Sequence, residues 1–451
     1  MEKQTKLYSD VVIIGAGLSG INMACQLQRQ LQVTSFVIYD RAAELGGAWA
    51  ANKYPGCGVD IPGVLYSLSW FPNPEFSKLF PTQREILAYI QRVAVAHGVP
   101  EQTKFRTEWK GAKWMESSST WHVYLYDLNT EQEFCHEAKL LISGVGGYTN
   151  PNLPVLPGLE SFEGPVVHTA KWDKEYNLRG LNVAVIGNGC SGSQVVPAVI
   201  EEVNSLTQLI RTPQHYVPMT IGNYQFSKKL RSLFCYLPFV LMLLRWFTFW
   251  ILDTARGQFY NDHEGKRIRQ QRLSYSRKYI TENAPERYLP LLTPDYDLGC
   301  RTTNISDLSM TRKCASPRNP SNSLNQRALS HHVGSTMPTS YSVNLVIEIV
   351  RPILNRKAAT IEVCKEAEAE WCDPIQTALG KTVLTRSCNN TEASTKTIQQ
   401  HTDLKGGWNF FFLSVQLTSV LGRHTLPGNE ALDLRIVLRI RAREYFESLE
   451  P

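Results

Sequence analysis

The chain has 451 residues, of which 43% are hydrophobic and 20% are charged, and its formal net charge is +6. This length is enough for two or three domains, and this composition is typical of a globular protein. Because the sequence contains no dense basic run with interleaved aromatic residues, it excludes nucleic acid as the expected partner.

The cysteines and the N-terminal residues indicate the cellular setting. Ten cysteines are scattered along the chain without a CxxC pair or a His-paired spacing, so we expect neither a metal site nor a dithiol redox centre. The polar N-terminal residues run directly into an apolar segment without the pattern of a secretory signal. We therefore expect a cytoplasmic protein with free thiols.

The first glycine-rich loop follows an apolar run, Asp10 to Ile14, which predicts a buried parallel strand. Its glycines have GxGxxG spacing and are Gly15, Gly17 and Gly20. A helix is expected from Leu18 to about Gln30, and a second strand, Ser35 to Tyr39, ends at Asp40. Such glycines let the backbone approach a pyrophosphate at the helix N-terminus, and an acidic residue in this position binds ribose hydroxyls. We predict a dinucleotide site here, with a purely structural glycine turn as the alternative.

The next segment carries the first resemblance to a known family. Gly46 and Gly47 would let the backbone lie against a second phosphate or ribitol chain, and Trp49 would cover the edge of a flavin. The series GAGLSG, D-x5-GGxW and YPGxxxD, followed by LYSLSWFPNPEF, resembles class B flavin monooxygenases of the Baeyer-Villiger type, especially fungal ones. The resemblance implies FAD in this part of the chain. It also implies that Asp60 lies near the flavin and helps to position a catalytic arginine; the alternative is an aspartate that satisfies turn amides.

Two further features precede the second glycine-rich loop. Polar and apolar residues alternate from Glu101 to Ala138, which predicts an antiparallel meander inserted in the first domain. The sequence FEGPVVHTAKWD, Phe162 to Asp173, matches the FxGxxxHxxxW pattern of the Baeyer-Villiger group. The resemblance implies that Gly164, His168 and Trp172 couple movement of the coenzyme domain to the flavin site. For His168 the alternatives are a structural role or direct proton transfer, and for Trp172 they are packing or contact with a cofactor.

The second glycine-rich loop, Asn182 to Gly192, repeats the first design with Gly187, Gly189 and Gly192. Pro197 should shorten or kink the helix that follows. The next predicted strand, Gln208 to Ile210, ends in Arg211 rather than in an acidic residue. An arginine there suits the 2′-phosphate of NADPH, with a surface arginine as the alternative.

A long apolar run, Leu233 to Leu252, would be long enough to cross a bilayer. Pro238 and Arg245 within the run argue against a membrane span. The resemblance implies a helical insertion over the substrate pocket instead. Contact with a membrane surface through the Trp and Phe side chains, and thus a membrane-associated protein, is the alternative.

The C-terminal third departs from the family pattern. After TPDYDLGC the family has a Gly-x-Lys-Arg pair, but this chain has Arg301 followed by Thr302. Either Arg301 replaces the coenzyme-binding lysine and the catalytic arginine is missing, or Arg301 is itself the catalytic arginine. From about Thr303 to Tyr341 the sequence is rich in Ser, Asn, Thr and Arg, which predicts a loop.

These elements predict an α/β fold with two Rossmann-like dinucleotide-binding domains, for FAD and NADP, an antiparallel β insertion and a helical insertion. We expect the first part of the FAD domain at 1–150, with its meander at about 101–138, and the first part of the NADP domain at 151–225. The helical insertion would occupy 226–292, and 293–451 would be a partly irregular remnant of the return to both domains.

Two cofactors whose reactive ends must meet indicate a flavoprotein that is reduced by NADPH. The resemblance implies a monooxygenase that uses O2 and a small organic substrate, with Baeyer-Villiger oxidation of a ketone in secondary metabolism as the leading hypothesis. One alternative oxygenates a heteroatom or carbon. Another is a nucleotide-binding remnant without turnover, because the C-terminal third is altered.

Overall fold

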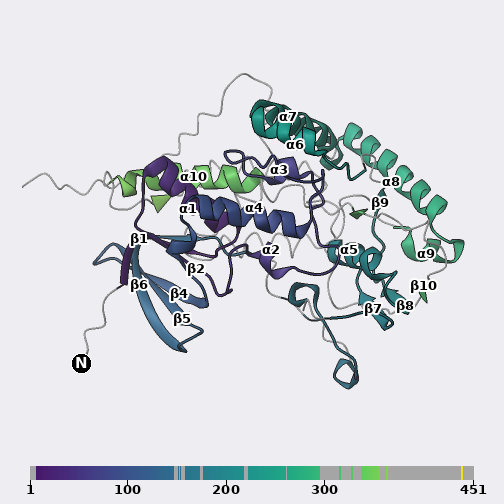
Figure 1. Cartoon of the computed structure of the whole chain (residues 1–451), viewed down its shortest axis with the longest axis horizontal. Helices are drawn as coiled ribbons and strands as arrows, with labels where there is room; N and C mark the ends of the chain where they lie inside the picture. The colour runs from purple at the N-terminus through teal and green to yellow at the C-terminus, as the bar shows by residue number, and fades with distance from the viewer. Residues whose placement is uncertain are drawn as a thin grey trace, which may run out of the picture.

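The computed structural model describes residues 7–146, 151, 153, 158–172, 176–217, 222–260, 262–294 and 337–355, together with four two-residue strands in the C-terminal third. Within this part of the chain, a six-stranded sheet and a three-stranded sheet form two separate layers of strands. Helices α1 (Leu18–Leu31), α4 (Gln83–Ala96) and α10 (Met337–Leu354) lie on one side of the six-stranded sheet, and α5 (Cys190–Val199) lies beside the three-stranded sheet (Figure 1).

The six-stranded sheet has the order β3-β2-β1-β6-β5-β4. Its parallel part contains β1 (Leu7–Ile14), β2 (Phe36–Tyr39) and β3 (Thr103–Lys104), and its antiparallel part contains β4 (Thr107–Met115) and β5 (Thr120–Asp127). The apolar run in β1 is fully buried, as expected for a parallel strand covered on both faces. The first predicted strand, the helix after it and the alternating meander are therefore confirmed.

The strand β6 (Gln132–Ser143) joins the two parts of this sheet. Its first half pairs with β5 in antiparallel fashion, and its second half, from His136 onward, pairs with β1 in parallel. The sequence pattern suggested a meander that ends at Ala138. In the structure its last strand continues to Ser143, because β6 pairs with β5 on one edge and with β1 on the other.

Three helices pack on one face of the sheet: α1 (Leu18–Leu31), α4 (Gln83–Ala96) and α10 (Met337–Leu354) (Figure 1). Helix α4 begins with a capping box between Thr82 and Glu85. The loop that we predicted from the sequence up to Tyr341 is wrong at its end, because α10 begins at Met337. Its buried residues recur at helical spacing: Val343, Val346, Ile347 and Val350. This spacing was visible in the sequence, and it places part of the C-terminal third in the core of the first sheet.

The antiparallel part of the sheet also packs over its parallel part. Side chains of β1, β2, β5 and β6 form one buried cluster. Beside it, the imidazole of His136 is only 5% exposed. Its Nε2 lies 2.8 Å from the Ser9 hydroxyl and its Nδ1 lies 2.7 Å from the Tyr39 hydroxyl. Burial lowers the pKa of His136 to about 4 because the charged ring would lose its hydration.

This buried histidine makes the stability of the fold depend on pH. The pKa of His136 is lower in the folded chain than in the unfolded chain, so the neutral ring stabilises the fold above about pH 6.5, and this contribution is lost as the pH falls toward 4. We expect the free energy of unfolding to fall by about 2 kcal/mol from this group between pH 7 and pH 5. Urea unfolding of the wild type and of His136→Gln at both pH values measures the effect. The variant should lose about 2 kcal/mol less over the interval, and an equal loss in both proteins would contradict the assignment.

The three-stranded sheet repeats the first motif on a smaller scale. Strands β7 (Asn182–Ile186) and β8 (Ser205–Leu209) are parallel and are connected by helix α5 (Cys190–Val199), while β10 (Cys314–Ala315) pairs with β8 in antiparallel fashion. Helix α5 ends two residues after Pro197, in agreement with the expected shortening. Two further strand pairs join β9 (Tyr216–Val217) to β11 (Arg327–Ala328) and β12 (Glu362–Val363) to β13 (Leu438–Arg439).

The predicted helical insertion contains α6 (Lys228–Tyr236), α7 (Pro238–Asp253), α8 (His263–Asn283) and the short α9 (Leu289–Leu292). Helices α6 and α7 cover the short helix α3 (Gly63–Tyr66) of the first unit (Figure 1). Pro238 breaks the apolar run into two helices because it cannot continue a helix that begins before it. Among the described residues, no single helix has the length and apolar character to cross a membrane; α6 and α7 meet those criteria only together, across a bend of 106°.

Candidate functional site

The first glycine-rich loop is packed so tightly that two of its three glycines, Gly15 and Gly20, have no room for a side chain. Gly15 has a positive φ of 103°, and a Cβ atom there would lie 2.7 Å from the Gly144 carbonyl oxygen. A Cβ atom on Gly20 would lie 1.9 Å from the carbonyl oxygen of Gly15. Both neighbours are backbone atoms, which cannot rotate away as a side chain would. The strand, the loop and α1 are thus held at contact distance, which is the role expected for the first and third glycines of the motif.

The structure brings the second glycine pair against this loop. The Gly46 amide donates to the carbonyl oxygen of Ala16 at 3.0 Å. Gly47 has a positive φ of 55°, and a Cβ atom there would lie 2.8 Å from the Cα atom of Gly17. The two segments that we predicted to contact phosphates therefore meet at one place, at the N-terminus of α1.

Asp40 also points toward this place from the end of β2. Its Oδ2 accepts a hydrogen bond of 2.6 Å from the Ala16 amide, and its Oδ1 accepts one of 2.7 Å from the Ala42 amide. These two bonds fix the carboxylate beside the glycine loop. The geometry fits an acidic residue that binds a ribose next to a pyrophosphate.

The helices that follow the glycine loops begin without a side-chain cap. Neither Gly17 at the start of α1 nor Gly189 at the start of α5 supplies a capping side chain, and neither first turn contains an acidic residue. By contrast, Ser227 caps α6 and Asp262 caps α8. Backbone N–H groups at an uncapped helix N-terminus, together with the helix dipole, are the donor set that a pyrophosphate requires.

Trp49 and Asp60 lie beyond the glycine pair. The Trp49 indole donates a hydrogen bond of 2.7 Å to the Tyr66 hydroxyl, and the two rings meet edge to face at 5.3 Å. The Gln83 amide donates to the Trp49 carbonyl oxygen. Asp60 is half-buried and follows Val59, whose amide donates to Pro81. The contacts fix Trp49 and the backbone before Asp60, while the roles predicted for both side chains stay predictions.

In the second glycine-rich loop, Gly187 is required by its positive φ and Gly192 by close packing. Gly187 has a φ of 103°, and a Cβ atom on Gly192 would lie 2.6 Å from the Gly187 carbonyl oxygen. The same carbonyl oxygen accepts a hydrogen bond of 3.0 Å from the Gln208 side chain. At Gly189, in contrast, a Cβ atom would meet no atom within 4 Å in the part of the chain that the structure describes. The protein itself does not require glycine at 189, so a ligand that approaches the backbone there would explain it.

Arg211 lies beside this second loop. Asn188, between the first two glycines of the loop, is buried and donates a hydrogen bond of 3.0 Å to the Thr212 carbonyl oxygen. This bond ties the loop to the turn that contains Arg211, which is half-buried. The residue after Arg211 therefore contacts the second loop directly. The role of Arg211 with a 2′-phosphate stays a prediction.

The two glycine-loop units are in direct contact, which sequence reasoning did not identify. The Tyr54 hydroxyl donates a hydrogen bond of 2.8 Å to Oε1 of Gln194 on α5, and Nε2 of Gln194 donates one of 3.1 Å to the Gly58 carbonyl oxygen. A Cβ atom on Gly56 would lie 2.3 Å from the Gln194 carbonyl oxygen. Burial raises the pKa of the Cys57 thiol to about 11, so this thiol is neutral at neutral pH. The contacts of Gln194 fix the segment before Asp60 against α5, the helix that follows the second loop.

The segment with the Gly, His and Trp pattern lies next to this contact. Trp172 packs against a buried cluster that includes Tyr54 of the first unit and Val195 of α5. His168 has a local role, since its Nδ1 accepts a hydrogen bond of 3.1 Å from the Ala170 amide. A Cβ atom on Gly164 would lie 2.7 Å from the ring of Phe162. The position of Trp172 fits a coupling element, while the coupling roles of His168 and Gly164 are not tested by these contacts.

Arg301 and Thr302 lie outside the described residues. The choice between a coenzyme-binding and a catalytic role for Arg301 therefore stays open.

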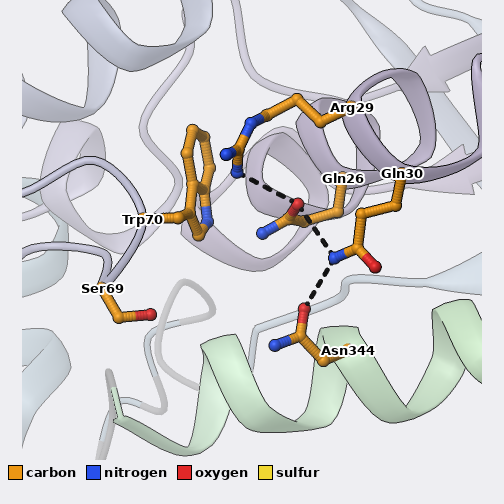
Figure 2. Close-up of a pocket in the computed structure, with 6 residues that line it drawn as sticks. All are labelled: Gln26, Arg29, Gln30, Ser69, Trp70 and Asn344. Atoms are coloured by element: carbon orange, nitrogen blue, oxygen red, sulfur yellow. Dashed lines mark hydrogen bonds between the residues drawn. The ribbon is translucent and has the colours of Figure 1, made fainter.

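A solvent-open pocket of about 380 Å³ is lined by residues of α1, by Ser69 and Trp70, and by Asn344 of α10 (Figure 2). Its side chains bond to one another: Gln26 accepts from Arg29 and Gln30, and Gln30 donates to Asn344 of α10. Gln26 is eight residues along α1 from its first residue, or roughly 12 Å from the N-terminus of the helix. We interpret this pocket as part of the polar contact between α1 and α10 rather than as the cofactor site.

Comparison with known proteins agrees with this geometry. Residues 8–214 match the family of flavin-binding monooxygenase-like proteins. A Baeyer-Villiger monooxygenase of Pseudomonas aeruginosa is 35% identical over 297 residues, which cover 66% of this chain and 54% of that protein. The FAD-binding monooxygenase ktnD of Aspergillus niger is 31% identical over 306 residues, which cover 66% of this chain and 49% of ktnD. The chain spans about half the length of these curated relatives.

A solved structure extends the comparison to the fold. Cyclohexanone monooxygenase from Rhodococcus sp. Phi1, determined with bound NADP+, is similar with a TM-score of 0.65 and a sequence identity of 20%, covering 85% of this chain and 91% of that chain. The expected α/β class with two Rossmann-like units is thereby confirmed.

Proposed function

Residues 8–214 of this chain belong to the flavin-binding monooxygenase-like family, and on this basis we propose that the protein is an FAD-dependent, NADPH-consuming monooxygenase. It would transfer one oxygen atom from O2 to a small organic substrate. The observation that carries the proposal is the pair of uncapped glycine-loop helices, α1 and α5, joined by the contacts of Gln194 with Tyr54 and Gly58.

The residues at the first loop fit FAD. The amides at the start of α1 would bind the pyrophosphate, and Asp40 would bind the adenosine ribose. Gly47 would let the protein backbone lie against a phosphate or the ribitol chain. Trp49 is already oriented by its bond to Tyr66 and would exclude water from the edge of the ring system. When bound, the flavin supplies the hydride acceptor and the site of oxygen activation.

The residues at the second loop fit NADPH. The start of α5 and the open position at Gly189 would receive its pyrophosphate, and Arg211 would bind the 2′-phosphate, which distinguishes NADPH from NADH. Asp60, two residues after the carbonyl group that Gln194 holds, would orient a cation beside the reacting atoms, with Arg301 as the candidate. We also propose the domain limits given above, with 1–150 and 151–225 as the first parts of the FAD and NADP domains.

The substrate class follows from the resemblance to the Baeyer-Villiger group. Gly164, His168 and Trp172 are all in register with its pattern, which favours conversion of a ketone to an ester or lactone in secondary metabolism over oxidation of a heteroatom. A second candidate function is nucleotide binding without turnover. The sequence after TPDYDLGC favours it, because Arg301 is followed by Thr302 instead of completing the Lys-Arg pair of the family.

Cofactor loading and oxygen consumption test the proposal. We expect purified protein supplied with FAD to show flavin absorbance, to take up O2 only with NADPH, and to convert a ketone to a product with one more oxygen atom. A sulfide substrate distinguishes heteroatom oxidation. Protein that binds both cofactors without O2 uptake would support the remnant, and protein that binds neither would overturn both functions.

A substitution in the second loop separates coenzyme binding from folding. In Gly189→Ala the new Cβ atom meets no atom of the described residues, so the thermal midpoint and the flavin content should not change. The Kd for NADPH should rise by about tenfold or more, because the pyrophosphate of the coenzyme can no longer approach the backbone of the loop. Isothermal titration of the flavin-loaded protein measures this change; an unaltered Kd would mean that NADPH does not contact Gly189.

The proposal includes a cytoplasmic location, for which the free cysteines among the described residues are suited. Contact of the Leu233 to Leu252 region with a membrane surface is a separate proposal, which depends on the exposed face of α7.

A further inference from the structure

Helix α7 carries a stripe of large apolar side chains that faces away from the protein. Six of its residues are between 52% and 66% exposed. They recur every three or four residues and so lie on one face of the helix. We call this set the apolar stripe: Phe239, Met242, Leu243, Trp246, Phe247 and Trp250.

The apolar stripe is held outward by the contacts of the opposite face of α7. Leu241 is buried in a cluster with Val64 and Leu65 of α3. Arg245 donates hydrogen bonds to the carbonyl oxygens of Val64 and Ser67, at 2.6 and 2.8 Å. Because these contacts fix the rotation of α7 about its axis, the stripe cannot turn inward. Figure 1 shows α6 and α7 at the outer edge of the molecule, beyond α3.

The geometry of the helix pair differs from that of a single membrane-spanning helix. Helix α7 has 16 residues and is therefore about 24 Å long, which is shorter than the hydrocarbon core of about 30 Å. The bend of 106° after α6 prevents the two helices from acting as one rod. A helix that is apolar on one face and anchored to protein on the other suits the plane of a bilayer surface.

The charges around the stripe identify its partner. Lys228 and Lys229 on α6 are exposed, and the sequence from 228 to 252 contains four basic residues but no acidic residue. Exposed Trp side chains favour the boundary between lipid headgroups and acyl chains, and lysines favour anionic headgroups. A second copy of this chain would present the same positive charge, and like charges disfavour that pairing.

We propose that the apolar stripe of α7 docks on the surface of an anionic lipid bilayer, with α7 parallel to the membrane plane and the lysines of α6 against the headgroups. This interaction does not depend on the proposed monooxygenase activity. Vesicle binding and catalysis can therefore fail separately.

Co-sedimentation of the full chain with lipid vesicles tests the docking. We expect binding to phosphatidylcholine vesicles that contain phosphatidylserine, and weaker binding to phosphatidylcholine alone. The double variant Trp246→Ser/Trp250→Ser should bind the anionic vesicles with an affinity reduced by about tenfold or more, because two large apolar side chains are lost. Trp109→Ser, which removes a 39% exposed indole from β4, is the matched control and should bind like the wild type.

A charge variant and the oligomeric state complete the test. Lys228→Gln/Lys229→Gln should weaken binding to the anionic vesicles only, and should reduce its dependence on salt concentration. Equal binding by the wild type and the Trp246→Ser/Trp250→Ser variant would overturn the proposal, as would a wild type that binds neither kind of vesicle. It would also be overturned if analytical ultracentrifugation showed a dimer that this double variant dissociates, because the stripe would then be covered by a second copy.

Discussion

Replacing Gly20 by alanine is expected to remove flavin binding and to destabilise the fold. The new Cβ atom would lie 1.9 Å from the backbone oxygen of Gly15, far inside van der Waals contact, so the loop or α1 must move. Overpacking against backbone costs about 3 kcal/mol of unfolding free energy or more. The same movement would displace the amides at the start of α1 from the position that the pyrophosphate needs. Flavin absorbance per mole of purified protein and the thermal midpoint should therefore both fall.

Two further glycine variants control this experiment. Gly146→Ala places a Cβ atom where no atom of the described residues lies within 4 Å and should leave both the flavin content and the thermal midpoint unchanged. Gly192→Ala creates a comparable clash, 2.6 Å from the Gly187 oxygen, in the second loop. It should impair NADPH binding while flavin remains bound. A Gly20→Ala protein with wild-type flavin content would show that the first loop does not hold the flavin.

The parts of the fold that the sequence predicted are those whose signal is local. The strand, glycine loop and helix at 10–30 are specified by a short apolar run, a fixed glycine spacing and amphipathic periodicity, which all act within about 20 residues. Pro238, which in the sequence argued only against a membrane span, separates α6 from α7 by an equally local effect, because it acts on its own helix. Local signals of this kind also located Asp40 and the two glycine loops.

The parts that the sequence did not predict depend on contacts between distant segments. Gln194 bonds to Tyr54 and Gly58, which lie 140 and 136 residues away, and nothing near Gln194 indicates that partner. Helix α10 was hidden by a different cause. Its first residues, Met337 to Tyr341, include Pro, Thr and Ser and show no apolar periodicity, so the pattern appears only from Val343 onward.

Arg245 illustrates how a contact changes the meaning of a residue. In the sequence it is a charge within an apolar run and argues only against a membrane span. In the structure it reaches the backbone of α3 and the residue after it, where the last carbonyl groups of a helix lack partners. Burial lowers the pKa of its guanidinium, which nevertheless stays protonated at neutral pH.

We expect Arg245→Met to lower the free energy of unfolding by about 3 kcal/mol, because two buried carbonyl groups each lose a charged donor while the methionine keeps most of the packing. Urea unfolding measures the loss, and protease cleavage between 228 and 253 should become faster if α7 detaches from α3. Arg267→Met is the matched control, since Arg267 pairs with Glu264 at the exposed surface of the same helical insertion and its loss should not change stability measurably. If both variants were as stable as the wild type, α7 would be held by its apolar contacts alone. The hydrogen bonds of Arg245 would then not be what fixes the outward orientation of the apolar stripe.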